Sequence, residues 1–188
     1  MSVSSTRKQA QSVDIPASEA TTAPIILSER SITGLALIRI FVGYLWFQQL
    51  FWKLPPDFAG LHQYFFKEAQ YTILPGYSFI LNNLFIPHFT LVAAGVWTAE
   101  LVVSLCLMFG LFTRLGALIS VALAAQLYIG LAYAPGEWYW TYGMLILLGL
   151  TLVAVPAGRR LGIDQLLALR LQAAGNNNRI VRLLSWLV

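Results

Sequence analysis

Residues 88–110 read HFTLVAAGVWTAELVVSLCLMFG, and Glu100 is the one charged side chain among them. A helix of about 20 apolar residues is long enough to span the hydrocarbon core of a bilayer, which is about 30 Å thick. An ionised side chain near the middle of such a helix is costly and calls for a partner or a function. The stretch therefore predicts a membrane-spanning helix with one special residue near its centre.

Three further apolar runs of similar length predict that the chain crosses the membrane four times. The expected spans are residues 31–53, 88–110, 114–135 and 138–157. Only 11% of the residues are charged, whereas a soluble domain carries about a quarter, and the mean hydropathy is +0.69. Each backbone amide in lipid must be satisfied within its own segment, which favours helices. The predicted fold class is an all-α membrane protein built on a four-helix transmembrane bundle.

Arg39 lies inside the first run about as deeply as Glu100 lies inside the second. If the two helices are antiparallel neighbours, both charges fall at a similar height, so we expect Arg39 and Glu100 to form an ion pair. Two interpretations of that pair remain open. It either fixes only which helices are neighbours, or it belongs to a site for binding or proton movement.

Polar and aromatic residues at related positions suggest a pocket around these two charges. Trp46 and Lys53 follow Arg39 at helical spacing, and Trp97 and Ser104 flank Glu100 in the same way. A quinone head group needs hydrogen-bond donors and a flat apolar surface, which such a set supplies. No catalytic residue is assigned. The candidates for a quinone or substrate pocket, with Lys53 or Arg114 at its mouths, are Arg39, Trp46, Lys53, Trp97, Glu100, Ser104, Arg114, Gln126 and Tyr142.

The distribution of Lys and Arg predicts the orientation, because short loops rich in these residues stay in the cytoplasm. Most of the arginines fall in segments that four antiparallel spans place on one side. We therefore expect a multi-pass protein of the plasma membrane with both termini in the cytoplasm. The connections at 54–87 and 134–138 are expected outside.

Three regions follow from these assignments. Residues 1–30 are rich in Ser, Thr, Ala and Gln and predict a cytoplasmic tail that is disordered in isolation. Residues 31–157 form the four-span bundle. Residues 158–188 predict amphipathic helices, interrupted at Gly175 and the asparagines after it, on the inner leaflet or against a partner subunit.

The first outer connection, residues 54–87, is too long for a simple turn and predicts two short interfacial helices. Its aromatic and apolar residues allow two interpretations. Phe58, Leu61, Phe65 and Phe66 either line a lid over the bundle or rest in the membrane interface.

Several classes of site are disfavoured by the composition. Cys106 is the single cysteine, which excludes an intrachain disulfide, and a small buried hydrophobic residue is the expected role. No zinc or iron–sulfur spacing occurs, and His62 and His88 both fall on the expected outer side. We therefore expect no metal and no intrinsic cofactor. The basic residues are not grouped as a nucleic-acid reader would require.

Several short stretches resemble the DoxX/DoxD family over about residues 33–167. They are Arg39–Gly43 (RIFVG), Trp52–Pro56 (WKLPP), Glu100, Gly110–Gly116 (GLFTRLG) and Gly158–Asp164 (GRRLGID). The WKLPP stretch and the long first connection look more like the DoxD branch, the membrane subunit of thiosulfate:quinone oxidoreductase. The resemblance implies a four-span protein that helps to transfer electrons from a reduced sulfur compound to quinone.

Two hypotheses about function follow. In the first, the chain is an integral membrane subunit of a quinone-linked oxidoreductase, acts with a partner subunit and binds a quinone, with thiosulfate or another reduced sulfur compound as the electron donor. In the second, it is a non-catalytic accessory or scaffold subunit of a larger respiratory or photosynthetic membrane complex. A family name constrains architecture better than activity, so both hypotheses stay open.

Overall fold

The computed structural model describes residues 29–173 and 179–188, and within them the chain is helical with no β-strand. The tail predicted for residues 1–30 lies almost wholly outside the described residues, as does the predicted helix break at residues 174–178. The helices are α1 (Glu29–Gln49), α2 (Ala59–Tyr71), α3 (Pro75–Ile80), α4 (Phe89–Phe109), α5 (Thr113–Leu131), α6 (Tyr139–Ala154), α7 (Asp164–Ala173) and α8 (Arg179–Leu187). Short 3₁₀ turns at Phe51–Lys53 and Ala157–Arg159 and a π-helical turn at Leu81–Phe85 join some of them.

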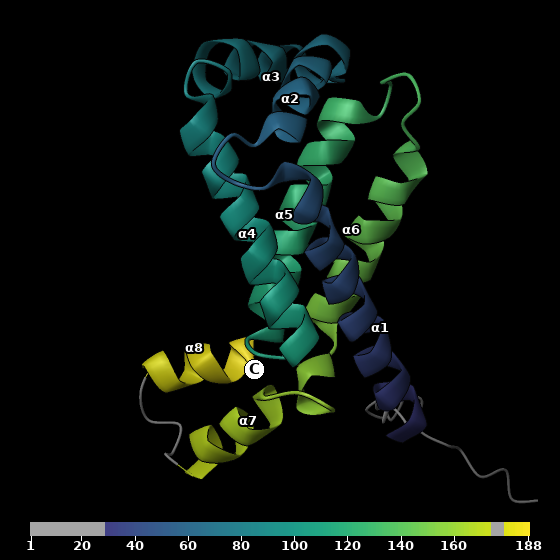
Figure 1. The fold of residues 1–188 in the computed structure, drawn as a ribbon. Coiled ribbons are helices and arrows are strands. Elements are labelled where there is room, and N and C mark those ends of the chain that lie inside the picture. The colour runs from purple at the N-terminus through teal and green to yellow at the C-terminus, as the bar shows by residue number, and fades with distance from the viewer. Residues whose placement is uncertain (1–28, 174–178) are drawn as a thin grey trace, which may run out of the picture.

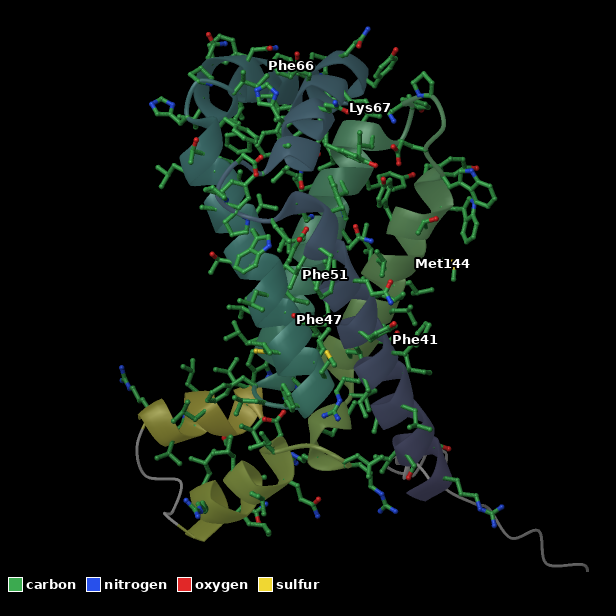
Figure 2. The ribbon with its side chains drawn as sticks, viewed as in Figure 1. Phe41, Phe47, Phe51, Phe66, Lys67 and Met144 are labelled. Carbon is green, nitrogen blue, oxygen red and sulfur yellow. The ribbon has the colours of Figure 1, made fainter. Side chains whose placement is uncertain are left out.

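Three helical segments are long and apolar enough to cross a membrane: Arg30–Lys53, Phe89–Phe109 and Thr113–Leu131. These match the first three predicted spans. Phe41, Phe51 and Met144 project outward from the helices, and each is more than half exposed (Figure 2). An apolar outer surface of this kind is suited to contact with lipid.

The fourth apolar run forms a shorter helix than its sequence suggests. α6 has 16 residues, which corresponds to about 24 Å of helix at 1.5 Å per residue. Val155 after the helix is extended, and Pro156 follows it. A residue before proline is biased away from helical geometry, so the helix ends earlier than the predicted boundary at residue 157.

The four main helices, α1, α4, α5 and α6, pack side by side (Figure 1). α1 packs on α4, α4 on α5 and α5 on α6, and α1 also contacts α6. Small residues allow close approach: a Cβ atom at Gly43 would lie 2.7 Å from the backbone nitrogen of Met108, and one at Gly149 would lie 2.6 Å from Val121 Cγ2. Lipid provides no hydrophobic drive for helix association, so close contact must supply the packing energy. Cys106 is buried and unpaired, as expected.

The segment before α7 joins the ends of α4 and α5. The Asp164 carboxylate accepts hydrogen bonds from the backbone N–H groups of Phe112 (2.7 Å) and Thr113 (2.9 Å). These are orphan donors at the start of α5, so Asp164 caps that helix from 51 residues further along the chain. The backbone N–H of Asp164 in turn donates to the Gly110 carbonyl at the end of α4, at 2.8 Å.

Arg39 reaches the same place from α1. Its Nη2 donates to the Leu161 carbonyl at 2.8 Å, and the side chain is fully buried. Gly110 has a φ of +62°, and a Cβ atom there would overlap Arg39 Nη1 and lie 2.7 Å from Gly162 Cα, so only glycine fits. We call this group, Arg39, Gly110, Leu161, Gly162 and Asp164, the basal clasp. It ties α1, α4 and α5 to the C-terminal segment.

α2 and α3 lie at the opposite end of the four main helices from the basal clasp (Figure 1). Residues 54–87 thus contain the two predicted short helices, and their place at the membrane interface stays a prediction. Phe58, Leu61 and Phe65 are buried against α4 residues such as Ala93, whereas Phe66 is 48% exposed. The end of α2 is fastened to α5 because the Thr72 side chain and the Ile73 N–H both donate to the Ile129 carbonyl.

α7 and α8 project beneath the four main helices (Figure 1). Arg114 of α5 donates to the Trp186 carbonyl at 2.7 Å and lies over the Trp186 ring at 5.5 Å. A cation at the carbonyl end of a helix complements its dipole. These contacts hold the last turn of α8 against the start of α5.

We expect Asp164→Ala to destabilise the protein by about 2–3 kcal/mol, because it removes two charge-assisted hydrogen bonds and leaves buried donors unpaired. The measurement is thermal unfolding of purified protein in lipid nanodiscs. Asp57→Ala is the matched control, since Asp57 is exposed and its loss should change the melting temperature little. Equal melting temperatures for the two variants would contradict the capping role of Asp164.

Candidate functional site

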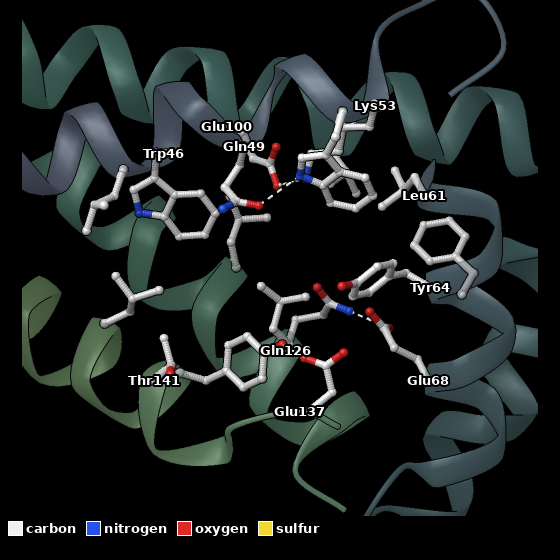
Figure 3. Close-up of a pocket in the computed structure, with 18 of the residues that line it drawn as sticks. Trp46, Gln49, Lys53, Leu61, Tyr64, Glu68, Glu100, Gln126, Glu137 and Thr141 are labelled. Atoms are coloured by element: carbon white, nitrogen blue, oxygen red, sulfur yellow. Dashed lines mark hydrogen bonds and ion pairs between the residues drawn. The ribbon is translucent and has the colours of Figure 1, made fainter. Parts of the chain in front are cut away.

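A cavity of about 420 Å³ lies among the four main helices, beneath α2 and away from the basal clasp. Side chains from α1, α2, α4, α5 and α6 line it. Figure 3 shows Trp46 and Lys53 on one side and Gln126 and Glu137 on the other, with open space between them. Ligand sites in proteins typically enclose about 300–1,000 Å³ and combine apolar walls with a few polar groups. The cavity has the size and the mixed lining of a small-molecule site.

Aromatic rings form much of the wall. Trp46 of α1 is buried, and its indole Nε1 donates to Ser120 Oγ of α5 at 2.8 Å, which holds the ring in place. Trp52 and Tyr64 lie together at 5.1 Å between ring centroids. Tyr142 completes the aromatic set from α6. Because the rings come from three helices and one turn, they surround the cavity rather than stacking on one side of it.

A buried ion pair lies in the wall. Lys53 Nζ is 2.5 Å from Glu100 Oε1, and both side chains are nearly inaccessible to solvent. The other carboxylate oxygen, Oε2, is buried and has no hydrogen-bond partner within the described residues. An unpaired buried carboxylate oxygen retains its desolvation penalty. The pair is therefore incompletely satisfied at a position that faces the cavity.

The expected Arg39–Glu100 ion pair is wrong, because Arg39 belongs to the basal clasp and Glu100 pairs with Lys53. The reason is the relative height of α1 and α4. Glu100 lies 11 residues after the start of α4, or about 16 Å along the helix, yet it meets the end of α1. α4 thus extends well beyond α1 toward α3 (Figure 1). The prediction assumed that the two spans end at the same level, and this assumption placed Arg39 beside Glu100 instead of Lys53.

The structure brings five of the nine candidate residues to the cavity and leaves four elsewhere. Those at the cavity are Trp46, Lys53, Glu100, Gln126 and Tyr142. Arg39 and Arg114 lie at the other end of the four main helices. Trp97 donates to the Leu50 carbonyl at 3.4 Å, and Ser104 bonds within its own helix to Leu101. Neither Trp97 nor Ser104 lines the cavity.

Glu68 of α2 is a second buried carboxylate at the cavity, which the sequence interpretation missed. Its Oε2 accepts hydrogen bonds from Gln126 Nε2 at 2.6 Å and from the Tyr77 hydroxyl at 3.2 Å. Burial raises the pKa of Glu68 to about 7, although both hydrogen bonds and the Lys53 charge act in the opposite direction. Glu68 therefore changes its protonation state near neutral pH.

A signal for Glu68 was present in the sequence. Leu61, Phe65 and Glu68 are spaced by four and three residues, so they share one face of a helix. The sequence analysis left open whether the first two line a lid or rest in the membrane interface, and the third lies on the same face. The pattern was overlooked because Glu68 follows Lys67, and two adjacent opposite charges are typical of an exposed surface.

A second polar group lies between α2 and α6. Lys67 Nζ is 2.7 Å from Glu137 Oε1, and the Tyr142 hydroxyl donates to Glu137 Oε2 at 2.7 Å. Burial acts to raise the pKa of Glu137, but the hydrogen bonds from Lys67 and Tyr142 outweigh it and leave the pKa lowered. Glu137 therefore stays ionised at neutral pH and links α2 to the turn before α6.

Several residues of the cavity wall are also exposed on the outside of the molecule. They are Leu45, Gln49 and Trp52 near the end of α1 and Trp138 and Thr141 near the start of α6. The cavity therefore opens between α1 and α6. Large apolar side chains form much of this opening, and Trp138 is 66% exposed.

The DoxX family model matches residues 34–129, just over half of the 188 residues. The chain belongs to the DoxX family. The matched region holds α1 to α5 except for a few terminal residues, and so includes Lys53, Glu68 and Glu100. With its several long apolar helices, this DoxX protein is a multi-pass membrane protein in contact with lipid. No curated protein and no solved structure matches the chain.

We expect single removal of either partner of the buried pair to destabilise this DoxX protein strongly. Glu100→Leu or Lys53→Met leaves an uncompensated buried charge, at a cost of about 3–5 kcal/mol. The double variant Lys53→Met/Glu100→Leu removes both charges and should recover most of that loss. Thermal unfolding in nanodiscs gives the coupling between the two positions.

The control for these variants is Lys67→Met, which breaks a more exposed ion pair and should cost no more than about 1 kcal/mol. If the two single variants cost no more than Lys67→Met, or if the double variant loses as much as the two singles combined, the pair does not hold α1 to α4.

Proposed function

We propose that the cavity binds the head group of a membrane quinone and that the chain is the quinone-side subunit of an oxidoreductase. The observation that carries the proposal is the combination of a 420 Å³ cavity, aromatic walls and a buried ion pair that faces it. A quinone ring needs a flat apolar slot, and its two carbonyl oxygens need hydrogen-bond donors. Trp46 and Tyr142 supply wall area for such a ring.

The polar side chains suit the two ends of a quinone ring. The Lys53 ammonium carries three N–H donors, and Glu100 accepts one of them. The remaining Lys53 donors are available for a quinone oxygen that enters the cavity. Across the cavity, Gln126 and Glu68 form a hydrogen-bonded group that suits the other oxygen.

The exposed apolar residues at the opening favour a ligand that arrives from lipid. Leu45, Trp52 and Trp138 would contact acyl chains or the isoprenoid tail of a quinone as it entered between α1 and α6. A small hydrophilic anion gains nothing from such an approach. This argument favours quinone over thiosulfate as the molecule bound in the cavity.

The proposed placement in the membrane has four crossings, made by α1, α4, α5 and α6. Arginines gather at the basal clasp end, including Arg30, Arg114, Arg159 and Arg170, which supports a cytoplasmic position for that end and for both termini. α2 and α3 would then lie on the outer face of the plasma membrane, and α7 and α8 on the inner leaflet. Trp138 and Trp140 both lie at the start of α6, and interfacial indoles of this kind support a crossing by a short helix.

The electrons would come from a partner subunit. Reduction of a quinone takes two electrons and two protons, and the resemblance to the DoxD branch suggests thiosulfate or another reduced sulfur compound as the donor. In this arrangement the partner oxidises the sulfur compound and the present chain holds the quinone.

We expect a photoreactive short-chain quinone to label residues of the cavity when the protein is illuminated in nanodiscs. Thr141→Phe fills the opening and should lower labelling at least about tenfold, equivalent to about 1.4 kcal/mol of binding. Thr98→Phe is the matched control, because Thr98 is exposed on α4 and does not line the cavity. Peptide mapping after labelling provides the measurement.

Two results would contradict quinone binding in the cavity. One is equal labelling of both threonine variants. The other is labelling that spreads over the lipid-facing surface and persists in excess unlabelled quinone.

A specific observation favours the second candidate function, an accessory subunit of a larger membrane complex. Leu166 and Leu169 of α7 are 64% and 60% exposed, and Leu183 of α8 is similarly open. Exposed apolar side chains on adjacent helices are typical of contact with another protein or with lipid. In this alternative they contact a partner subunit.

If α7 contacts a partner, Leu166→Asp/Leu169→Asp should release that subunit during purification from native membranes. Leu74→Asp is the control, because Leu74 is equally apolar and half exposed but lies beside α3. The measurement is the set of subunits that co-purifies with a tagged chain in mild detergent. An unchanged set with the α7 variant would remove this surface from the accessory hypothesis.

A further inference from the structure

Glu68 is the most unusual group at the cavity after the Lys53–Glu100 pair. Its side chain is almost completely buried, at 1% exposure. A Cβ atom at Gly130 would lie 2.7 Å from Glu68 Cγ, so α5 approaches the carboxyl stem directly and holds it against the cavity. Neither the ion pair of the cavity wall nor the packing of α2 requires a carboxylate at this position.

We propose that Glu68 passes protons between the ligand in the cavity and the α2–α3 side of the molecule, with Tyr77 as the connecting group. The proposal rests on the proposed function only for the identity of the ligand. It extends that function because it names the residue that supplies protons and the side from which they come.

The hydrogen bonds define a short relay. The Tyr77 hydroxyl donates to Glu68 Oε2 and accepts from Gln126 Nε2 at 2.9 Å. Gln126 also donates to Glu68, so it fixes both oxygens from α5. Tyr77 is only partly buried, and it lies in α3 at the end of the molecule where α2 and α3 cover the main helices (Figure 1). A hydroxyl that donates and accepts is able to pass a proton without moving far.

The charges around Glu68 suit repeated exchange. Lys53 acts on it from the turn after α1 and favours the carboxylate, whereas burial favours the acid. A group whose pKa lies near the working pH gives up and regains a proton with little cost in either direction. The other titratable groups that face this region are Tyr64 and Lys67 of α2, Tyr77 of α3, Glu100 of α4, Glu137 of the α5–α6 turn and Tyr142 of α6.

The electrons and protons that a bound quinone takes up can all be accounted for. The quinone takes two electrons from the partner's reduced sulfur compound and two protons in succession from the Glu68 carboxylic acid, and becomes the quinol. After each transfer the Glu68 carboxylate takes the Tyr77 hydroxyl proton, while Tyr77 takes one from water on the α2–α3 side. Glu68 and Tyr77 return to their starting states, and the sulfur compound is the species oxidised.

The test is infrared difference spectroscopy of the protein in nanodiscs, which detects the C=O band of a protonated carboxyl group. We expect a band that titrates near pH 7 in the wild type and is absent in Glu68→Gln. Asp57→Asn is the matched control, since Asp57 lies exposed in the same connection and its replacement should leave the band unchanged. We expect Tyr77→Phe to keep the band but to slow its hydrogen–deuterium exchange by about tenfold or more.

The ligand provides a second arm with the photoreactive short-chain quinone as the probe. If labelling or quinone reduction changes with pH across neutrality in the wild type and loses that dependence in Glu68→Gln, the proposal is supported. If quinone binds but Glu68→Gln keeps the same pH profile, the proton role is wrong and the proposed function stands. If no quinone binds, the proposed function fails, and the infrared band and its exchange in Tyr77→Phe still decide the role of Glu68. A band that persists in Glu68→Gln, or exchange that is unchanged in Tyr77→Phe, overturns the relay.

Discussion

The Lys53–Glu100 ion pair sets the relative height of the first two long helices, and both of its residues line the cavity. Lys53 is in the 3₁₀ turn after α1, whereas Glu100 is in the middle of α4. Pairing them leaves the upper half of α4 without α1 beside it. α2 occupies part of the vacant region and packs Phe65 and Leu61 against α4, and it also supplies part of the cavity wall. A charge among apolar helices needs its counter-charge nearby, so the pair constrains helix position more strongly than apolar contacts, which tolerate sliding.

The basal clasp joins the main helices at the end opposite the Lys53–Glu100 pair. Arg39 and Asp164 saturate backbone groups that helix ends leave unpaired, namely a carbonyl before α7 and two N–H groups at the start of α5. They come from opposite ends of the sequence. Three of the motifs that carry the family resemblance meet here, which gives them a physical reason: each supplies a donor, an acceptor or a glycine without a side chain. The cavity residues lie at the α2–α3 end of the main helices, and the basal clasp holds the helices together at the opposite end.

The sequence was sufficient for the helices and for part of the site. Apolar run length predicts α1, α4 and α5 because lipid thickness restricts them. Trp46 was placed by its helical spacing from Arg39, and Gln126 and Tyr142 were placed by their depth in the spans. The partner of Glu100 was missed because span boundaries do not reveal how far one helix slides past another. Arg39 lies on α1 and Lys53 in the 3₁₀ turn that follows it, both within the first predicted span, so composition and spacing cannot distinguish between them. Glu68 was missed because its burial depends on α5 at Gly130 and on Gln126, and both are distant in sequence.

The two ends of the molecule differ in how their buried carboxylates are satisfied, although Arg39 Nε and Nη1 in the basal clasp also have no hydrogen-bond partner among the described residues. A buried ion pair adds little net stability and is often replaceable by apolar residues, so stability alone does not explain Lys53 and Glu100. In the basal clasp, both oxygens of the Asp164 carboxylate accept hydrogen bonds. Glu100 instead keeps one buried oxygen without a partner among the described residues, and burial raises the pKa of Glu68 to about 7. Both lie on the cavity, where a ligand with its own hydrogen-bonding groups would complete what the protein leaves open.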